Sequence, residues 1–393
     1  MEEFKVTLQT LTPVWTGNVE RKCKDLRLTG LLGSLRWWFE ALVRGMGYKA
    51  CDSTGEKCEL KLEKPTDLQS ITQKLCPACF LFGTTGWKKR FWVGVEDEDI
   101  KQAYDRKIIV EFPQQRGWHY ESGLFGRAKL RFLYENYVFL DGTELKGYLP
   151  SVLRMLLYFI QEYGMVGAKT ALGYGVVRFE EGKNKDSEDK TGLLSVSQED
   201  WGKFNRFLSY FKTKEIRDLP NIKDMFCIKF EVTEDINGVF NKIQEFNNIE
   251  KFLKIQNGAV SVELKEWRAN SWLITTPFVR KEIRKAIKNK FPQNQPLRHF
   301  LMGKVIGQNT KFSAIQVSHI YQNSNNNLEF RIWGWLPKSK CQDKRNEIIK
   351  LFSELFNNVP WSKFIPCQIT EWGTWENNEL KLVKDIKKLL VKR

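Results

Sequence analysis

Histidine is scarce in this sequence of 393 residues, which contains only three: His119, His299 and His319. No two of them have the spacing of a shared metal site, and a lone histidine supplies no catalytic mechanism by itself. Long apolar runs are also missing, since none approaches the roughly 20 residues that a membrane-spanning helix needs. The N-terminus, MEEFKVTLQT, starts acidic and has no apolar signal-peptide core. These absences predict a cytoplasmic protein with no membrane partner.

Negative charge is in short supply relative to positive charge. Lys and Arg number 63 against 47 Asp and Glu, which gives a formal net charge of +16. With 42% hydrophobic and 28% charged residues, the composition is that of a globular chain. Such a surplus attracts polyanions, of which nucleic acid is the first candidate and an anionic membrane the second. Some of the 14 Trp and 27 Phe are then available to stack on bases.

Eight cysteines are present, and a cytoplasmic location makes them thiols or metal ligands rather than disulfides. Cys51, Cys58, Cys76 and Cys79 lie in one polar, turn-rich excursion. Cys76 and Cys79 form a C-x-x-C pair, whereas six residues separate Cys51 from Cys58, an irregular spacing for a zinc site. An excursion with little apolar content needs a staple, which a structural Zn²⁺ on four thiolates would supply. Unliganded thiols are the alternative.

The apolar periodicity predicts two similar halves. The order strand, helix, two strands, helix, strand is legible in residues 1–195 and again, more loosely, in residues 196–393, and that order is ferredoxin-like. We therefore predict an α+β protein of two tandem ferredoxin-like (RRM-like) domains with a boundary at the polar stretch 180–200. The first domain carries the zinc-stapled insertion, at about 47–95, and the second ends in a helical C-terminal tail. No close sequence repeat accompanies this pattern.

The stretch 25–46 predicts an amphipathic helix, with Thr29 as its N-cap. Its apolar residues recur at three-four spacing, and Arg36, Glu40 and Arg44 occupy the opposite face at i, i+4 spacing. Two interpretations are open. The arginines are either solvated, as on most charged helix faces, or they hold phosphates.

Residues 164–175, GMVGAKTALGYG, follow a predicted helix and precede a predicted strand. This is the reverse of a dinucleotide-binding fingerprint, and the lysine-serine/threonine ending of a P-loop is missing. Glycine allows backbone N–H groups to approach a ligand closely, and Lys169 adds positive charge. The alternative is a helix end running into a tight turn.

Basic residues elsewhere complete the candidate nucleic-acid surface. Arg127, Lys129 and Arg131 alternate onto one face of a predicted strand, and Arg280 and Arg284 recur at helical spacing. As a set with the aromatic residues, the cations favour binding to an RNA backbone with some base stacking. The predicted RNA-binding residues are Lys24, Arg27, Arg36, Arg44, Arg127, Lys129, Arg131, Gly167, Lys169, Gly173, Gly175, Arg280, Arg284, Arg298, Lys304 and Lys311.

The glycine-rich stretch after the second helix of a ferredoxin-like unit resembles the hallmark of the RAMP proteins of CRISPR systems. Four further stretches together resemble the family of subunit one of the Cmr (type III-B) effector complex. They are Leu11–Gly17 (LTPVWTG), Gly30–Phe39 (GLLGSLRWWF), Cys76–Gly83 (CPACFLFG) and Arg331–Pro337 (RIWGWLP). Because they occur in both halves, the resemblance covers most of the chain.

The resemblance implies two tandem RAMP domains in a subunit that holds the 3′ region of the guide RNA and helps it engage target RNA. It also implies partnership with other Cmr RAMP subunits, a role in antiviral defence, and no nuclease activity. Zinc in such insertions is known from similar RAMP proteins. One alternative is a RAMP endoribonuclease that processes CRISPR repeat RNA with His119 as general base. Another is a free-standing basic RNA chaperone.

Overall fold

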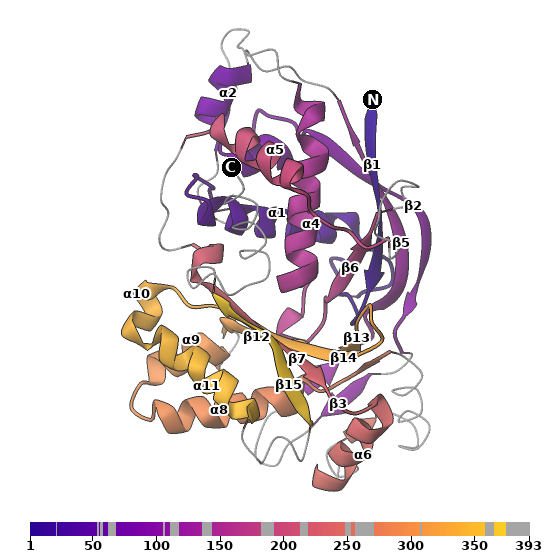
Figure 1. Cartoon of the computed structure of the whole chain (residues 1–393), viewed down its shortest axis with the longest axis vertical. Helices are drawn as coiled ribbons and strands as arrows, with labels where there is room; N and C mark the ends of the chain where they lie inside the picture. Colours follow the sequence, from indigo (N-terminus) through magenta and orange to yellow (C-terminus); the bar gives the residue numbers. More distant parts are fainter. Residues whose placement is uncertain are drawn as a thin grey trace.

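The structure, a computed structural model, describes residues 1–374 apart from 21, 53–54, 56–57, 62–67, 105–106, 111–117, 136–143, 182–191, 213–218, 248–252, 256–270, 307–308 and 358–364. It is a mixed α+β structure with antiparallel sheets (Figure 1). Its strands are β1 (Glu2–Thr10), β2 (Phe91–Gln102), β3 (Ile108–Val110), β4 (Trp118–Tyr120), β5 (Leu124–Tyr134), β6 (Val177–Glu180), β7 (Met225–Val232), β8 (Leu253–Ile255), β9 (Trp272–Leu273), β10 (Lys304–Ile306), β11 (Asn309–Lys311), β12 (Ile315–Val317), β13 (Ile320–Gln322), β14 (Leu328–Trp335) and β15 (Cys367–Thr374). Its main helices are α1 (Leu28–Gly45), α2 (Leu68–Lys74), α3 (Pro77–Phe82), α4 (Leu149–Tyr163), α5 (Gln198–Ser209), α6 (Ile236–Asn247), α8 (Thr276–Lys290), α9 (Gln295–Met302), α10 (Lys338–Cys341) and α11 (Arg345–Asn357).

The first sheet has the strand order β2-β5-β1-β6. Phe4, Val6 and Leu8 alternate inward along β1 and are buried, whereas Lys5 and Thr7 on the other face are partly exposed, as the period of two requires. Helices α1 and α4 pack on the buried face (Figure 1). With the excursions left aside, the element order β1, α1, β2, β5, α4, β6 is the one that the sequence predicted.

The second sheet has the order β15-β7-β14-β13-β9, and β12 also pairs with β14. Helices α8, α9 and α11 lie below this sheet in Figure 1, while the C-terminal end of α4 approaches it from above. Along the chain this half contains β7, α6, β8, β9, α8, α9, β10 to β14, α10, α11 and β15, which is more elements than the predicted order of strand, helix, two strands, helix and strand. The second ferredoxin-like domain therefore stays a prediction. A small third sheet, β4-β3-β8, joins strands from both halves of the chain.

Buried charges fasten the end of α4 to the second sheet. Lys229 on β7 lies 2.7 Å from a carboxylate oxygen of Glu162 on α4 and 2.9 Å from one of Glu371 on β15. Arg331 on β14 donates from Nη1 to the carbonyl oxygen of Gln161 at 2.9 Å. Burial by itself raises the pKa of the Glu162 carboxyl. The charge and hydrogen bond of Lys229 act in the opposite direction, and the pKa is lowered to about 2. The two halves therefore share one ionic joint, in which the cations are buried and the carboxylates are partly buried.

Several local predictions change in the structure. The helix predicted to be capped by Thr29 begins at Leu28, with Arg27 at the N-cap position and no side-chain cap. The single strand predicted over 312–321 divides into β12 and β13, because the backbone N–H of His319 between them donates to the carbonyl oxygen of Gly173 at 3.3 Å. A strand predicted near 260–264 and the predicted C-terminal helical tail lie outside the described residues. The boundary between residues 195 and 196 stays a prediction.

Membrane insertion receives no support from the described part of the chain, where every helix is too short or too polar to cross a bilayer.

Candidate nucleic-acid interface and metal centre

The glycine-rich stretch is held by the segment that continues β1. The N–H of Ala168 donates to the carbonyl oxygen of Trp15 at 2.8 Å, and the N–H of Gly175 donates to that of Pro13 at 2.8 Å. Helix α1 adds a third contact, because the N–H of Gly167 donates to Ser34 Oγ at 2.8 Å. Three segments that are far apart in the sequence therefore meet at this loop.

The glycines permit close approach of the main chain, but the atoms that approach them belong to this protein and not to a ligand. Gly173 has a φ of +94°, and a Cβ built there would lie 2.1 Å from Thr276 Oγ1 and 2.7 Å from His319 Nδ1. At Gly167, with a φ of +81°, a Cβ would lie 2.5 Å from the carbonyl oxygen of Trp15. Both positions therefore need glycine for internal packing. Residues 173–176 are buried, whereas residues 167–172 remain partly exposed.

The tryptophans of two other stretches meet beside the loop. Trp38 on α1 donates from its indole N–H to the carbonyl oxygen of Met165 at 2.8 Å. Its ring centroid lies 5.0 Å from that of Trp333 on β14. Gly164 packs directly on Trp38, since a Cβ there would come within 2.9 Å of the indole ring. The loop, α1 and β14 thus form one aromatic junction.

A cavity of about 540 Å³ and another of about 700 Å³ are present in the described part of the chain, and the larger one opens at this junction. Its walls come from the stretches Leu11–Gly17, Gly30–Phe39 and Arg331–Pro337 together with the glycine-rich loop. A fifth segment, which includes Phe312 and Gln316, and the single residue Pro220 complete it. We call this space the junction cavity. The residues lining it are Trp15, Thr16, Gly17, Gly30, Gly33, Ser34, Trp37, Trp38, Met165, Gly167, Ala168, Thr170, Pro220, Phe312, Ser313, Gln316 and Trp333.

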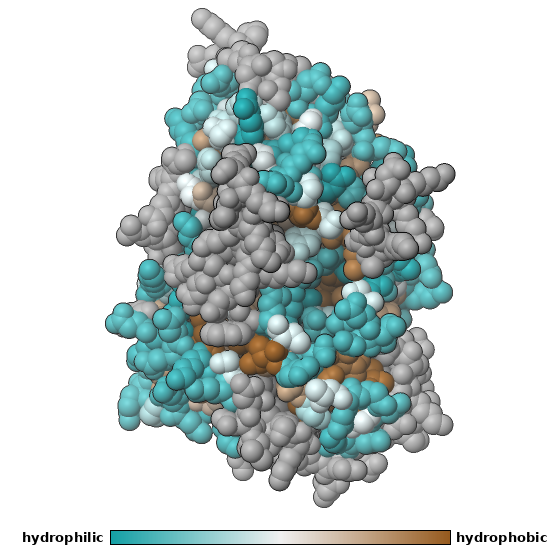
Figure 2. Space-filling model, in the orientation of Figure 1, coloured by the Kyte–Doolittle hydropathy of each residue, from teal (hydrophilic) through white to brown (hydrophobic). Residues whose placement is uncertain are grey.

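Apolar surface also gathers near the middle of the molecule. On the face drawn in Figure 2, brown apolar residues surface at the level of β12 and β14 and are surrounded by hydrophilic ones. Phe312 is 89% exposed, which is unusual for so large an apolar side chain.

The N-terminus of α1 borders the junction cavity. Gly30 and Gly33 in its first turns line the space, and a Cβ at Gly33 would meet no atom within 4 Å. The helix has no side-chain cap and no acidic residue in its first turn. Its unsatisfied N–H groups therefore retain the partial positive charge that attracts anions. Lys24 and Arg27, just before the helix, are both exposed.

The four cysteines of the excursion form one cluster, as the sequence predicted. Their Sγ atoms all lie within 4.8 Å of one another, and the four residues are buried. Cys51 Sγ lies 3.7 Å from Cys76 Sγ and 3.1 Å from Cys79 Sγ. Thiolates bound tetrahedrally to Zn²⁺ at about 2.3 Å stand roughly 3.8 Å apart, so the donor set and its spacing fit a metal ion such as zinc.

Charged residues of α1 surround this cluster. Arg36 donates from Nη2 to Cys79 Sγ at 3.2 Å and from Nη1 to the carbonyl oxygen of Gly83 at 2.9 Å. Arg44 donates to the carbonyl oxygens of Cys51 and Ala50 at 2.7 and 3.0 Å. Glu40, which is 1% exposed, lies 2.9 Å from Arg36 Nε. The charged face of this helix therefore faces the cysteine cluster, which corrects the expectation that it points to solvent or to RNA.

The other predicted RNA-binding residues fall into three groups. Arg280 is buried and donates to the carbonyl oxygen of Ile315 at 2.7 Å, so it supports the wall of the junction cavity; burial lowers its pKa to about 10. Arg127, Lys129 and Arg131 lie along β5 as predicted, but each pairs with a carboxylate of Glu96 or Glu180. The residues of the third group are exposed or partly exposed: Lys24, Arg27, Lys169, Arg284, Arg298 and Lys304. Lys311 lies on β11, in a hairpin with β10.

Lys169 is partly exposed and already has partners. Its Nζ lies 3.2 Å from the centre of a Trp15 ring and 2.8 Å from a carboxylate oxygen of Glu121. It therefore stiffens the rim of the junction cavity.

The histidines occupy different environments. His119 is exposed on β4. His319 is buried between β12 and β13, where its Nδ1 lies 2.9 Å from Thr276 Oγ1. Burial lowers the pKa of His319 to about 3, so its ring is neutral at physiological pH.

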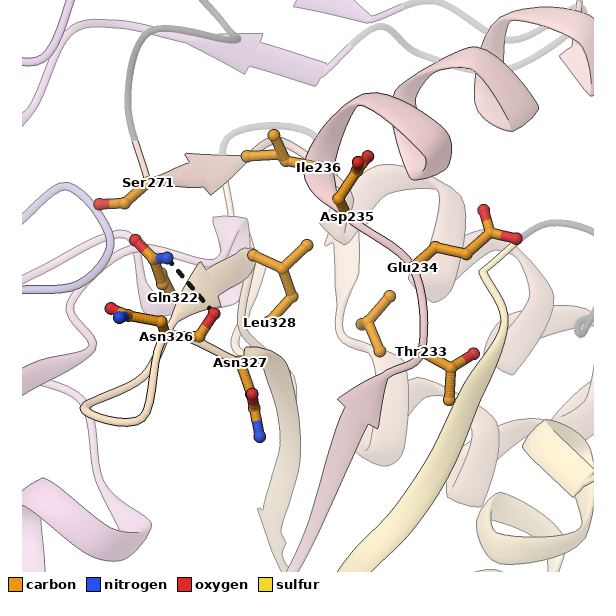
Figure 3. Close-up of a pocket in the computed structure, with 10 residues that line it drawn as sticks. Thr233, Glu234, Asp235, Ile236, Ser271, Gln322, Asn326, Asn327 and Leu328 are labelled. Atoms are coloured by element: carbon orange, nitrogen blue, oxygen red, sulfur yellow. Dashed lines mark hydrogen bonds between the residues drawn. The ribbon is translucent and has the colours of Figure 1, made fainter.

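The smaller cavity, which the sequence did not suggest, has polar walls (Figure 3). Glu234 and Asp235 enter it from the start of α6, and Gln322, Asn326 and Asn327 line the other side. These groups are engaged locally. Asp235 Oδ1 accepts a hydrogen bond from the N–H of Gly238 at 2.7 Å, and Gln322 Nε2 donates to the carbonyl oxygen of Asn326 at 3.3 Å.

Comparison with protein families covers the part of the chain that builds most of this site. Residues 7–178 extend from β1 to β6 and contain α1, the cysteine cluster and the glycine-rich loop. This segment matches the RAMP superfamily. The RAMP segment is less than half of the chain.

No curated protein matches the chain. One solved structure that does match is a chain of the type III-B Cmr-beta complex bound to cognate target RNA and AMPPnP, in the presence of ssDNA. The two chains are 13% identical with a TM-score of 0.40, and the match covers 89% of this chain and 99% of the other.

Proposed function

We propose that this chain is a non-catalytic RNA-binding subunit of a type III-B CRISPR (Cmr) effector complex, built from two tandem ferredoxin-like RAMP domains. In that role it contacts the 3′ region of the guide RNA and the target RNA beside other Cmr RAMP subunits. One observation carries the proposal. Three of the four stretches that resemble the Cmr family line the junction cavity together with the glycine-rich loop. The fourth stretch, Cys76–Gly83, does not line the cavity but contacts α1 through Arg36.

The rim of the junction cavity suits a phosphate backbone. It combines the uncapped N-terminus of α1 with two exposed cations that precede this helix, Lys24 and Arg27, the second of which has its Nε 2.9 Å from a carboxylate oxygen of the exposed Asp25. The backbone N–H groups of residues 169–171 begin the short 3₁₀ turn Thr170–Leu172 and find no acceptor within the described part of the chain. Phosphates held here would leave bases close to Trp37 and Phe312.

The cysteine cluster is proposed to hold one structural Zn²⁺. The ion would fix Cys51 and Cys79, which are linked through Arg44 and Arg36 to the helix that lines the junction cavity. Its role in this account is to position α1, with no chemistry on RNA.

Lys24→Ala and Arg27→Ala are expected to weaken binding of single-stranded RNA and to flatten its salt dependence. Each lost phosphate contact should reduce the slope of log K against log[salt] by about 0.7. Fluorescence anisotropy with labelled CRISPR repeat RNA over a salt series measures this. Lys129→Ala and Arg131→Ala serve as matched controls, since these residues pair with Glu96 on the β5 face, do not line the junction cavity and should leave the slope unchanged. Equal slopes in all four variants would refute this placement of the RNA.

The same reactions, run without metal, distinguish binding from catalysis. Intact RNA after prolonged incubation supports the proposed role. Cleavage to a 2′,3′-cyclic phosphate that disappears in His119→Ala would establish the endoribonuclease alternative instead. Failure to co-purify with Cmr subunits would favour the free-standing RNA chaperone.

A further inference from the structure

Two polar atoms of the junction cavity lack hydrogen-bond partners. Within the described part of the chain, Gln316 Oε1 on β12 and Trp333 Nε1 on β14 are buried and unpaired. The two residues are 8% and 7% exposed and lie directly opposite each other in the β12–β14 pair. Both line the cavity. The cavity therefore has one unpaired acceptor and one unpaired donor side by side.

The surroundings determine which of these two atoms can donate a hydrogen bond and which can accept one. Gln316 Nε2 donates to the carbonyl oxygen of Ser313 at 2.7 Å, so the amide oxygen is the group left over. An indole N–H can only donate. Buried polar groups in native proteins nearly always find a partner, and an unpaired one in a concave site points to a ligand or water that completes it.

The remaining walls suit a flat aromatic ligand. Trp37 and Phe312 contribute aromatic rings to the lining, and Phe312 is 89% exposed. Gly33 leaves open space, since a Cβ there would meet no atom within 4 Å, whereas a Cβ at Gly30 would lie 3.3 Å from Thr16 Cβ. The volume of about 700 Å³ lies within the roughly 300–1,000 Å³ typical of sites for small organic ligands.

We infer that the junction cavity receives an unstacked nucleobase of the bound RNA, an inference that rests on the proposed function. The ring stacks on Trp37 or Phe312, a base amino or imino group donates to Gln316 Oε1, and a neighbouring base acceptor receives the hydrogen bond of Trp333 Nε1. Bases carry such donor–acceptor neighbours, for example N6 and N7 of adenine. RNA-binding proteins commonly capture splayed single-stranded bases by stacking and edge contacts.

The experiment compares two labelled RNAs of equal length with the full chain, a short oligo(rA) and a strand with the same backbone but abasic sugars. We expect oligo(rA) to bind roughly tenfold more tightly, because one base–aromatic stack is lost in the abasic strand. Gln316→Met keeps the size of the side chain but removes the acceptor, and Trp333→Phe removes the donor. Each should remove most of the preference for oligo(rA) without changing the affinity of the abasic strand or the salt slope.

Gln322→Met is the matched control, since this glutamine lies in the smaller cavity and should leave the preference intact. Trp37→Ala provides a variant at a partly exposed position if those in the sheet fold poorly. Equal binding of both strands by the wild-type chain, or an unchanged preference in Gln316→Met and Trp37→Ala, would overturn the nucleobase site while leaving RNA binding in place. If neither strand binds to the chain, the proposed function is overturned as well. Displacement of oligo(rA) by AMP at similar concentration would assign the cavity to a free nucleotide instead.

Discussion

Zinc is expected at about one ion per chain, and Cys76→Ser is expected to abolish its binding. Cys76 is 1% exposed, and its Sγ accepts a hydrogen bond from the N–H of Cys79 at the start of α3. Structural Zn²⁺ binds small stapled units with an apparent free energy of roughly 10 kcal/mol or more at neutral pH. Loss of the ion should therefore unfold the surroundings of α3 and loosen α1, with a large drop in RNA affinity. Elemental analysis and hydrogen exchange over residues 47–90 measure the two effects.

Two variants sharpen this prediction. Cys367→Ser changes a partly buried cysteine outside the cluster and should retain the metal. Arg36→Met removes the donor to Cys79 Sγ and should weaken metal affinity by about 10- to 100-fold, as loss of contacts to ligating atoms typically does. A metal-free wild-type chain, with the same thermal stability as Cys76→Ser, would contradict the assignment of a structural ion.

Lys229→Met is expected to lower the free energy of unfolding by about 3–5 kcal/mol at pH 7, because it removes a buried cation from the partly buried carboxylates of Glu162 and Glu371. Lys203→Met is the surface control. Its ion pair with Glu199 is exposed and should contribute at most about 0.5 kcal/mol. Denaturant unfolding of both variants provides the comparison.

The effect of pH has a definite sign. The pKa of Glu162 is about 2 in the folded wild-type chain, below its unfolded value of about 4.3. Its pairing therefore stabilises the fold above pH 4.3, and this contribution is lost as the pH falls towards 2. In Lys229→Met the carboxyl of Glu162 keeps the hydrogen bond from Gln161 and the charge of Arg331 but loses its strongest partner. Its pKa therefore rises, and acid relieves the unpaired charge. The stability gap between the two chains should shrink between pH 7 and pH 4, and a constant gap would contradict the ionic joint.

Periodicity predicted some elements of the fold, such as β1 and α4, but not the helices α5, α6 and α9. The alternation in β1 and the apolar spacing of α4 identified these elements because each pattern is local. Charge on a helix face was not sufficient. Arg44 could be solvated or bound to phosphate as far as the sequence shows, and its partners include the carbonyl oxygen of Pro220, which is far away in the chain. Contacts of this range depend on how the halves pack.

The cysteine cluster was predictable because its ligands lie close together in sequence, whereas the junction cavity was not. The stretches around Trp15, Trp38 and Trp333 were recognised separately, but their meeting depends on both sheets and the end of α4. Gln316 was not among the predicted site residues, since a single glutamine in an apolar strand matches no sequence motif. Its position opposite Trp333 in the sheet, which only the structure shows, makes it a candidate ligand contact.

If the proposed function is correct, segments from both halves of the chain form one RNA-binding surface at the junction cavity. Ultraviolet cross-linking of bound RNA to the full chain, followed by mass spectrometry of the modified peptides, tests it most directly. We expect cross-links at Trp37 and Phe312, and in the peptide containing residues 167–172. Cross-links confined to the β5 face around Lys129, with none in these peptides, would contradict it.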